Sequence, residues 1–223
     1  MLYLDMGDPV LLAFPTPFFR HRWPEVQARP VNAALKAEIL ARRERLPTAQ
    51  VSNVGGWQSE PDIMNWPVPE MAQLSQWINQ AFRMIMGREL GTNDFKSRYV
   101  IAGWANINES GHYNRTHIHP DHHWSGVYYV DCGRPDPKIS PNGAIEIVDP
   151  RSAVGVFQLP NNQRASGIWE LQPEPGTMLL FPSWLRHSVL PYFGDGPRIS
   201  VSFNLRVSKF TFSDERDADG PGG

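Results

Sequence analysis

Five short segments in the C-terminal half of the chain have the composition of β-strands and follow one another without a long helical interruption. They are rich in β-branched and aromatic residues, and Gly, Pro and Asp turns separate them. The segments are Ser97–Ile107, Trp124–Val130, Gly143–Val148, Thr177–Phe181 and Arg198–Val207. Strands that do not alternate with helices favour antiparallel pairing over a βαβ fold. The pattern therefore predicts an antiparallel sandwich or barrel over about residues 97–210.

Two helices are expected before this β-rich half, in a helical N-terminal part of about residues 30–90. Residues 32–46 are rich in strong helix formers, and a second segment from Glu70 to about Met86 carries an apolar stripe. Such a stripe is expected to pack against a sheet. The chain is therefore predicted to be mainly β with N-terminal helices, forming a single domain over residues 1–212. The polar, glycine-rich residues 213–223 are expected to be a disordered tail.

Length and charge restrict the function classes. A chain of 223 residues suits one compact core. The net charge is −2 and no block of Lys or Arg stands out, so no nucleic acid partner is expected. No apolar run is long enough to cross a membrane, and a single cysteine, Cys132, allows no internal disulfide. We expect a cytoplasmic protein without a membrane partner, and its oligomeric state is left open.

Metal-ligating side chains are concentrated in one short stretch, which holds His117, His119 and Asp121. In an extended strand, side chains two residues apart point to the same face, so His119 can pair with either neighbour. A further histidine, His187, lies far downstream. Two ligands from one short segment and one from a distant strand are typical of a facial metal site with open coordination positions. The spacing alone permits either His117 with His119 or His119 with Asp121 as the pair of ligands.

Five blocks in this half of the chain occur together with that spacing. They are Trp104–Asn106, Asn114–Pro120, Ser125–Val130, Gly176–His187 and Arg198–Asn204. Taken together, they resemble a 2-oxoglutarate/Fe(II)-dependent oxygenase family of bacteria and phages. The resemblance implies a double-stranded β-helix, also called a cupin or jelly-roll barrel, that carries Fe(II) and 2-oxoglutarate. Within these blocks the further candidate site residues are Trp104, Asn106, Asn114 and Asn204.

The resemblance also implies roles for the ligands. The broader oxygenase class uses a His-x-Asp…His triad, which would assign His119, Asp121 and His187. Members of the resembled family often carry Asn or Gly where Asp121 stands, which favours His117 in its place. The predicted iron ligands are therefore His117, His119 and His187, with Asp121 as the alternative ligand.

The cosubstrate prediction rests on Arg198, eleven residues after His187. An anionic carboxylate buried in a barrel needs a fixed cationic fork, which an arginine supplies. The resemblance implies that Arg198 and Ser200 bind the far carboxylate of 2-oxoglutarate, with Tyr129 as a third partner. Because Tyr128 and Tyr129 are adjacent in a strand, only one of the two rings can face the site. A surface ion pair of Arg198 with Asp131 or Asp195 is the competing interpretation.

These residues predict a dioxygenase dependent on Fe(II) and 2-oxoglutarate that hydroxylates an unidentified small molecule or protein side chain. One alternative is a cupin-type metalloenzyme that does not use 2-oxoglutarate, and such an enzyme would have no use for Arg198 and Ser200. Another alternative is a non-catalytic module that binds metal for stability or sensing. Turnover of 2-oxoglutarate separates the predicted oxygenase from both.

Overall fold

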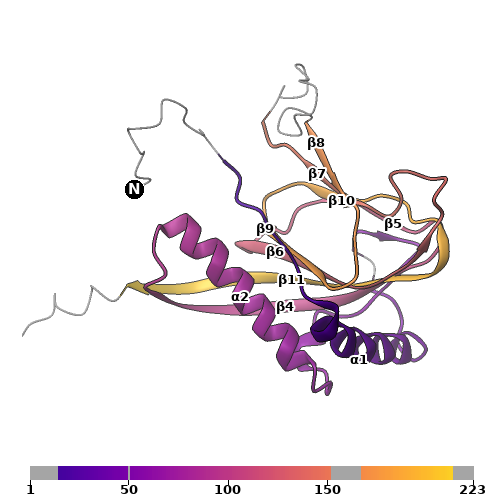
Figure 1. Cartoon of the computed structure of the whole chain (residues 1–223), viewed down its shortest axis with the longest axis horizontal. Coiled ribbons are helices and arrows are strands. Elements are labelled where there is room, and N and C mark those ends of the chain that lie inside the picture. The colour runs from indigo at the N-terminus through magenta and orange to yellow at the C-terminus, as the bar shows by residue number, and fades with distance from the viewer. Residues whose placement is uncertain (1–14, 50, 152–166, 213–223) are drawn as a thin grey trace, which may run out of the picture.

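The structure of the protein is a computed structural model, and it describes residues 15–49, 51–151 and 167–212. Two antiparallel sheets face each other (Figure 1). The larger sheet has the strand order β1 (Phe19–Arg22), β9 (Thr177–Pro182), β6 (Trp124–Pro135), β11 (Gly194–Phe212), β4 (Phe95–Asn108) and β3 (Trp57–Gln58). The smaller sheet has the order β2 (Asn53–Val54), β5 (Tyr113–His117), β10 (His187–Val189), β7 (Ile145–Val148) and β8 (Ile168–Leu171). This arrangement confirms the predicted mainly-β, double-stranded β-helix fold.

The N-terminal part contributes two helices and three short strands. The strands β1, β2 and β3 join the two sheets, which the sequence did not indicate because two to four residues carry too little pattern. A 3₁₀ turn, Ile63–Asn65, lies between β3 and the second helix. The predicted tail, residues 213–223, lies outside the described residues.

Helix α1 (Glu25–Arg43) begins earlier than the predicted residue 32 and includes Pro30. Its buried positions are Ala28, Val31, Leu35 and Ile39, which recur at helical spacing. Proline in a helix interior removes one backbone hydrogen bond, and packing of this buried stripe against the sheet offsets that cost. Tertiary packing therefore extends the helix through a residue that local propensity marks as a boundary.

Helix α2 (Met71–Leu90) matches the second predicted helix and runs one turn further. It ends where Gly91 adopts a left-handed backbone conformation, with a φ of 69°. The predicted apolar stripe is buried in the main core, which lies between the two helices and the larger sheet. No helix among the described residues is long and apolar enough to cross a membrane.

Alternation along β11 separates this core from the space between the sheets. One set of side chains packs with the helices and consists of Ile199, Val201, Phe203 and Leu205. The alternate set is polar and consists of Arg198, Ser200, Ser202 and Asn204. Because a strand sends successive side chains to opposite faces, the polar set faces the smaller sheet. The strand thus stabilises the fold with one face and lines a polar interior with the other.

Candidate metal and cosubstrate site

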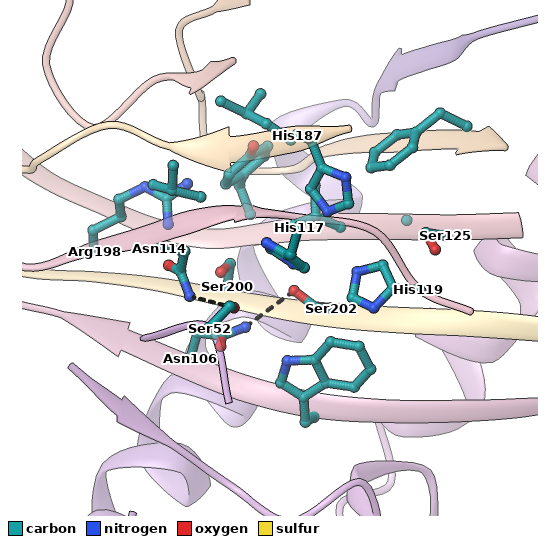
Figure 2. Close-up of a pocket in the computed structure, with 17 residues that line it drawn as sticks. Ser52, Asn106, Asn114, His117, His119, Ser125, His187, Arg198, Ser200 and Ser202 are labelled. Atoms are coloured by element: carbon teal, nitrogen blue, oxygen red, sulfur yellow. Dashed lines mark hydrogen bonds between the residues drawn. The ribbon is translucent and has the colours of Figure 1, made fainter. Parts of the chain in front are cut away.

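Three histidines from two strands and one loop converge between the sheets (Figure 2). His117 ends β5 and lies opposite His187, the first residue of β10. His119 follows in the loop, where its backbone N–H donates to the Ser183 carbonyl at 3.0 Å. One candidate ligand atom from each imidazole lies within 4.8 Å of the other two. The strand pairing and this loop hydrogen bond therefore bring together residues that are up to 70 positions apart in the sequence.

Backbone carbonyls orient two of the three imidazoles. The Nδ1 atom of His117 lies 2.7 Å from the Arg115 carbonyl oxygen, and that of His187 lies 2.8 Å from the Leu185 carbonyl oxygen. A carbonyl only accepts hydrogen bonds, so each Nδ1 carries the proton and donates it. The Nε2 atom of each ring then keeps its lone pair. This is the arrangement by which metal-binding histidines are held in the ligating tautomer.

Burial keeps the cluster neutral. The pKa of His119 is lowered to about 3, first by desolvation and then by the neighbouring His187 and His117. Desolvation, with a smaller effect of His117, lowers the pKa of His187 to about 4. The pKa of His117 is also lowered by burial, although its hydrogen bond to the Arg115 carbonyl opposes the shift. All three imidazoles are therefore neutral at pH 7, the form that ligates a metal.

Asp121 does not join this group. The strand β5 ends at His117, so the alternation assumed for residues 117–121 stops before Asp121. Asp121 is exposed in a turn and has a φ of 66°, a backbone conformation that directs the chain out of the extended path. Among the described residues, the group of potential metal ligands contains His117, His119 and His187 but not Asp121.

Arg198 is buried, and one hydrogen bond to a described backbone carbonyl holds its side chain. Its side chain is 2% exposed, and its Nε donates to the Gly143 carbonyl at 3.1 Å. The two carboxylates considered as ion-pair partners are taken by other cations: Asp131 pairs with Lys36 at 2.6 Å, and Asp195 lies 3.7 Å from Arg134. No described carboxylate lies within 4.0 Å of the Arg198 guanidinium. The surface ion-pair interpretation is therefore wrong.

Tyr129 and Ser200 lie beside this guanidinium. Ser200 pairs with Tyr129 in the register of β6 and β11, and the Arg198 Cζ lies 5.2 Å from the centre of the Tyr129 ring. Burial raises the pKa of Tyr129 to about 12, against the opposing effect of Arg198, so the phenol stays protonated. Among the described residues, its buried Oη has no hydrogen-bond partner. A buried cation and an unpaired buried hydroxyl together fit an anionic ligand.

The adjacent Tyr128 faces the opposite side of the sheet, as the alternation predicts. Its ring lies in the core under the helices, and its Oη donates to the Asn32 carboxamide oxygen at 2.7 Å. One tyrosine of the pair therefore faces the site and the other faces the helices.

The remaining predicted site residues also line the space between the sheets. Asn106 donates to the Ser202 hydroxyl at 3.0 Å, and Asn114 donates to the Ser52 hydroxyl at 3.3 Å (Figure 2). At the other end of the cavity, the Ser125 hydroxyl donates to the Asn204 carboxamide oxygen at 2.8 Å. These hydrogen bonds fix the polar wall on both sides of the histidines.

Sequence reasoning missed three serines of this wall: Ser52, Ser125 and Ser202. Ser202 shares the face of Ser200 by strand alternation, which is a signal that could have identified it. Ser52 lies in an irregular loop, and its approach to Asn114 depends on the pairing of β2 with β5. No local pattern in the sequence reports that pairing.

An open groove with a volume of about 490 Å³ adjoins the inner pocket. The half-buried Trp104 stands at the boundary, with its ring centre 5.6 Å from that of His119. Both hollows are lined by Ser52, Trp104, His117 and His119. Arg198, Ser200 and Tyr129 line only the inner one. The histidines thus lie between an enclosed polar pocket and a groove that opens to solvent.

Comparisons with known proteins give a consistent result. Residues 102–204 match the family model described as "Putative 2OG-Fe(II) oxygenase". This segment includes every predicted site residue. No curated protein sequence matches the chain.

Three solved structures illustrate the shared fold. A prolyl-4-hydroxylase from Pseudomonas putida has a TM-score of 0.58 and 18% identity, covering 86% of this chain and 92% of that chain. The α-ketoglutarate-dependent carbocyclase SnoK from nogalamycin biosynthesis has a TM-score of 0.60 and 12% identity, with coverages of 88% and 82%. A Trichoplax adhaerens prolyl hydroxylase, solved with a hypoxia inducible factor peptide, has a TM-score of 0.56 and 12% identity, with coverages of 90% and 85%.

These structural similarities show the fold, and the family match adds the activity class. The match falls on the strands that carry the histidine cluster, Arg198 and Ser200. Fe(II) and 2-oxoglutarate are the metal and the cosubstrate of that class. Residues 102–204, the part of the chain that carries the candidate site, therefore match the 2OG-Fe(II) oxygenase family.

Proposed function

We propose that His117, His119 and His187 bind Fe(II), and that Arg198 binds the far carboxylate of 2-oxoglutarate together with Ser200 and Tyr129. One observation carries this assignment. A single pocket presents three neutral imidazoles and a buried guanidinium that has no described carboxylate partner (Figure 2). Each half of the pocket fits one of the two groups that the family requires.

The donor set suits a catalytic metal. Imidazole nitrogens bind Fe(II), and three ligands on one face leave the remaining positions open for a cosubstrate and dioxygen. When bound, Fe(II) and 2-oxoglutarate would allow dioxygen to act as the oxidant: one oxygen atom would enter succinate as 2-oxoglutarate loses carbon dioxide, and the other would be inserted into a substrate C–H bond. The contribution of the protein is to bind these groups, to orient them and to exclude water.

The side chains of the pocket meet these requirements. The guanidinium of Arg198 offers a planar fork of donors, and the neutral phenol of Tyr129 offers a further O–H donor to the same anion. A second cluster of buried apolar residues, separate from the main core, surrounds the inner pocket and limits the entry of water; it includes Val127, Ile145 and Phe181. The carbonyls of Arg115 and Leu185 hold the ligating tautomers of His117 and His187.

We propose that the groove next to the histidines receives the substrate, either a small molecule or a side chain of a protein. Trp104 would form one wall of that groove.

The alternative of a cupin that does not use 2-oxoglutarate leaves the burial of Arg198 without a purpose. A cytoplasmic location remains a prediction from the sequence.

The direct test is a titration of the anaerobic protein. We expect one Fe(II) per chain by metal analysis, and one equivalent of 2-oxoglutarate by calorimetry after iron loading. Admitting oxygen should then yield succinate, slowly without substrate. One iron per chain without any binding of 2-oxoglutarate would establish the cupin alternative. Binding of both without any succinate would establish a non-catalytic module.

Tyr129→Phe separates cosubstrate binding from folding. Removing a buried hydroxyl that has no hydrogen-bond partner among the described residues should leave the free energy of unfolding unchanged or raise it by up to about 1 kcal/mol. The dissociation constant for 2-oxoglutarate should rise about three- to tenfold, because one neutral hydrogen bond is lost. Chemical denaturation and calorimetry measure the two effects.

Tyr128→Phe is the matched control. This change removes the hydrogen bond to Asn32 and should cost about 1 kcal/mol of stability, while 2-oxoglutarate binds as in the unmodified protein. An unchanged dissociation constant in Tyr129→Phe would remove Tyr129 from the cosubstrate site.

A further inference from the structure

The strands β4 and β11 continue beyond the barrel as a two-stranded ribbon. The last pair between β11 and β6 is Leu205 with Trp124, whereas β11 stays paired with β4 as far as Phe212 and Phe95. Figure 1 shows the two strands extending together past the rest of the sheet, with α2 beside them. The ribbon therefore has one face against a helix and a second face that the smaller sheet does not cover.

Strand alternation assigns the side chains of the ribbon to these faces. The helix face holds residues that pack with the main core, such as Tyr99, Ile101 and Val207. The opposite face of β4 runs from Trp104 through Val100 to Arg98 and Lys96, and the last three are exposed. This is the face that lines the site, because Trp104 and Asn106 belong to it. The surface of the substrate groove thus continues onto the ribbon.

Four cations occupy this continuation. Arg206 lies opposite Val100, and Lys209 lies opposite Arg98. We call Lys96, Arg98, Arg206 and Lys209 the basic ribbon; all four are exposed.

No described carboxylate forms an ion pair with a member of the basic ribbon. Some exposed arginines elsewhere do have such partners, for example Arg22 with Glu174 at 2.5 Å, whereas none of the four adjacent cations of the ribbon has a described one. The pairing of Arg98 with Lys209 places like charges directly opposite each other, which destabilises a sheet. An unbalanced charge of this kind, continuous with the groove, fits an anionic partner.

We propose that the basic ribbon binds an extended, acidic segment of a protein substrate while a residue of that segment enters the groove. This proposal rests on the proposed function. The exposed Val100, 63% accessible, lies among the cations and suits a peptide that alternates apolar and acidic side chains. Among the described residues, the outer edge of β4 pairs only at Gly103, Asn106 and Ile107. The main chain from Lys96 to Ala102 therefore has no described strand partner on that edge. Such an edge can pair with an added strand.

A peptide fits this surface better than single-stranded nucleic acid does. Nucleic acid sites of this kind combine cations with aromatic rings on which the bases stack. The exposed side chains of the ribbon face, among the described residues from 96 to 100 and from 206 to 209, include no aromatic ring.

The distance along the strand predicts the spacing within the substrate. Arg98 is six residues from Trp104, or about 20 Å of extended chain. The acidic residues of the substrate should therefore lie about six positions from the oxidised residue.

The test measures peptide binding by the full chain. Fluorescein-labelled dodecaglutamate is titrated with the protein at low salt, and fluorescence anisotropy gives the dissociation constant. A twelve-nucleotide oligothymidylate serves as the competing polyanion. Arg98→Gln combined with Arg206→Gln removes two cations of the basic ribbon. Arg29→Gln combined with Lys138→Gln removes two exposed cations elsewhere that have no described ion pair, so the change in net charge is matched.

We expect the ribbon variant to bind dodecaglutamate about tenfold more weakly than the unmodified protein, and the control variant to bind within about twofold of it. Equal losses in the two variants, no binding of dodecaglutamate, or tighter binding of oligothymidylate would each overturn the proposal. Neither iron nor 2-oxoglutarate is needed in this assay. Peptide binding in a protein that fails to bind 2-oxoglutarate would therefore refute the proposed function and leave the docking surface in place.

Discussion

His187→Ala and His117→Ala should each reduce bound iron from one per chain to about a tenth or less after desalting. Each change removes one of three protein ligands, and even changes in the groups that orient such ligands weaken metal binding by about 10- to 100-fold. Metal analysis of the anaerobically loaded protein measures the result. Because His187 is 6% exposed, its truncation also removes buried contacts, so His187→Gln and a thermal unfolding curve should accompany it.

Asp121→Ala is the decisive control for the ligand set. Asp121 is exposed in a turn, outside the histidine group, so its loss should leave one iron per chain. His122→Ala adds a second control, because this imidazole is also outside the group. A metal-free Asp121→Ala with a fully loaded His117→Ala would establish the two-histidine, one-carboxylate triad of the broader class instead.

Arg198→Ala should weaken the binding of 2-oxoglutarate on the order of 100-fold while iron stays bound. Truncating one partner of a buried, hydrogen-bonded charge pair costs about 2–5 kcal/mol, much of it from the carboxylate left without a partner. Arg198→Lys should recover only part of the affinity, because an ammonium keeps the charge but lacks the planar fork. Calorimetry on the anaerobic Fe(II) protein measures both variants.

Arg134→Ala is the matched control for this experiment. Arg134 lies on the neighbouring strand β6, and its guanidinium is exposed beside Asp195. Its removal should leave the dissociation constant for 2-oxoglutarate unchanged, since a surface ion pair contributes little and does not line the pocket. An Arg198→Ala variant that titrates like the unmodified protein would show that the cosubstrate binds elsewhere.

The fold class and the candidate residues could be predicted from local patterns. The β-branched and aromatic composition of the segments 97–107 and 198–207 predicted strands, and the structure extends these to Phe95–Asn108 and Gly194–Phe212. Side chains along a strand alternate between its two faces. The same alternation placed Arg198 and Ser200 on one face and sent Tyr128 and Tyr129 to opposite faces. The strands β5 and β10, which carry His117 and His187, are only five and three residues long. Segments of that length hold too few side chains for a periodic signal.

The sequence by itself determined the chemistry that this chain can offer: imidazoles two residues apart, a distant histidine, and an arginine followed by a serine on one strand. Only the tertiary structure decided which of these groups meet. The end of β5 at His117 separates Asp121 from the cluster, and the pairing of β5 with β10 brings His117 to His187. The burial of Arg198 away from Asp131 and Asp195 was equally undetermined by the sequence. The physical reason is that side-chain periodicity is a local property, whereas ligand geometry and desolvation depend on contacts between segments that are distant in the sequence.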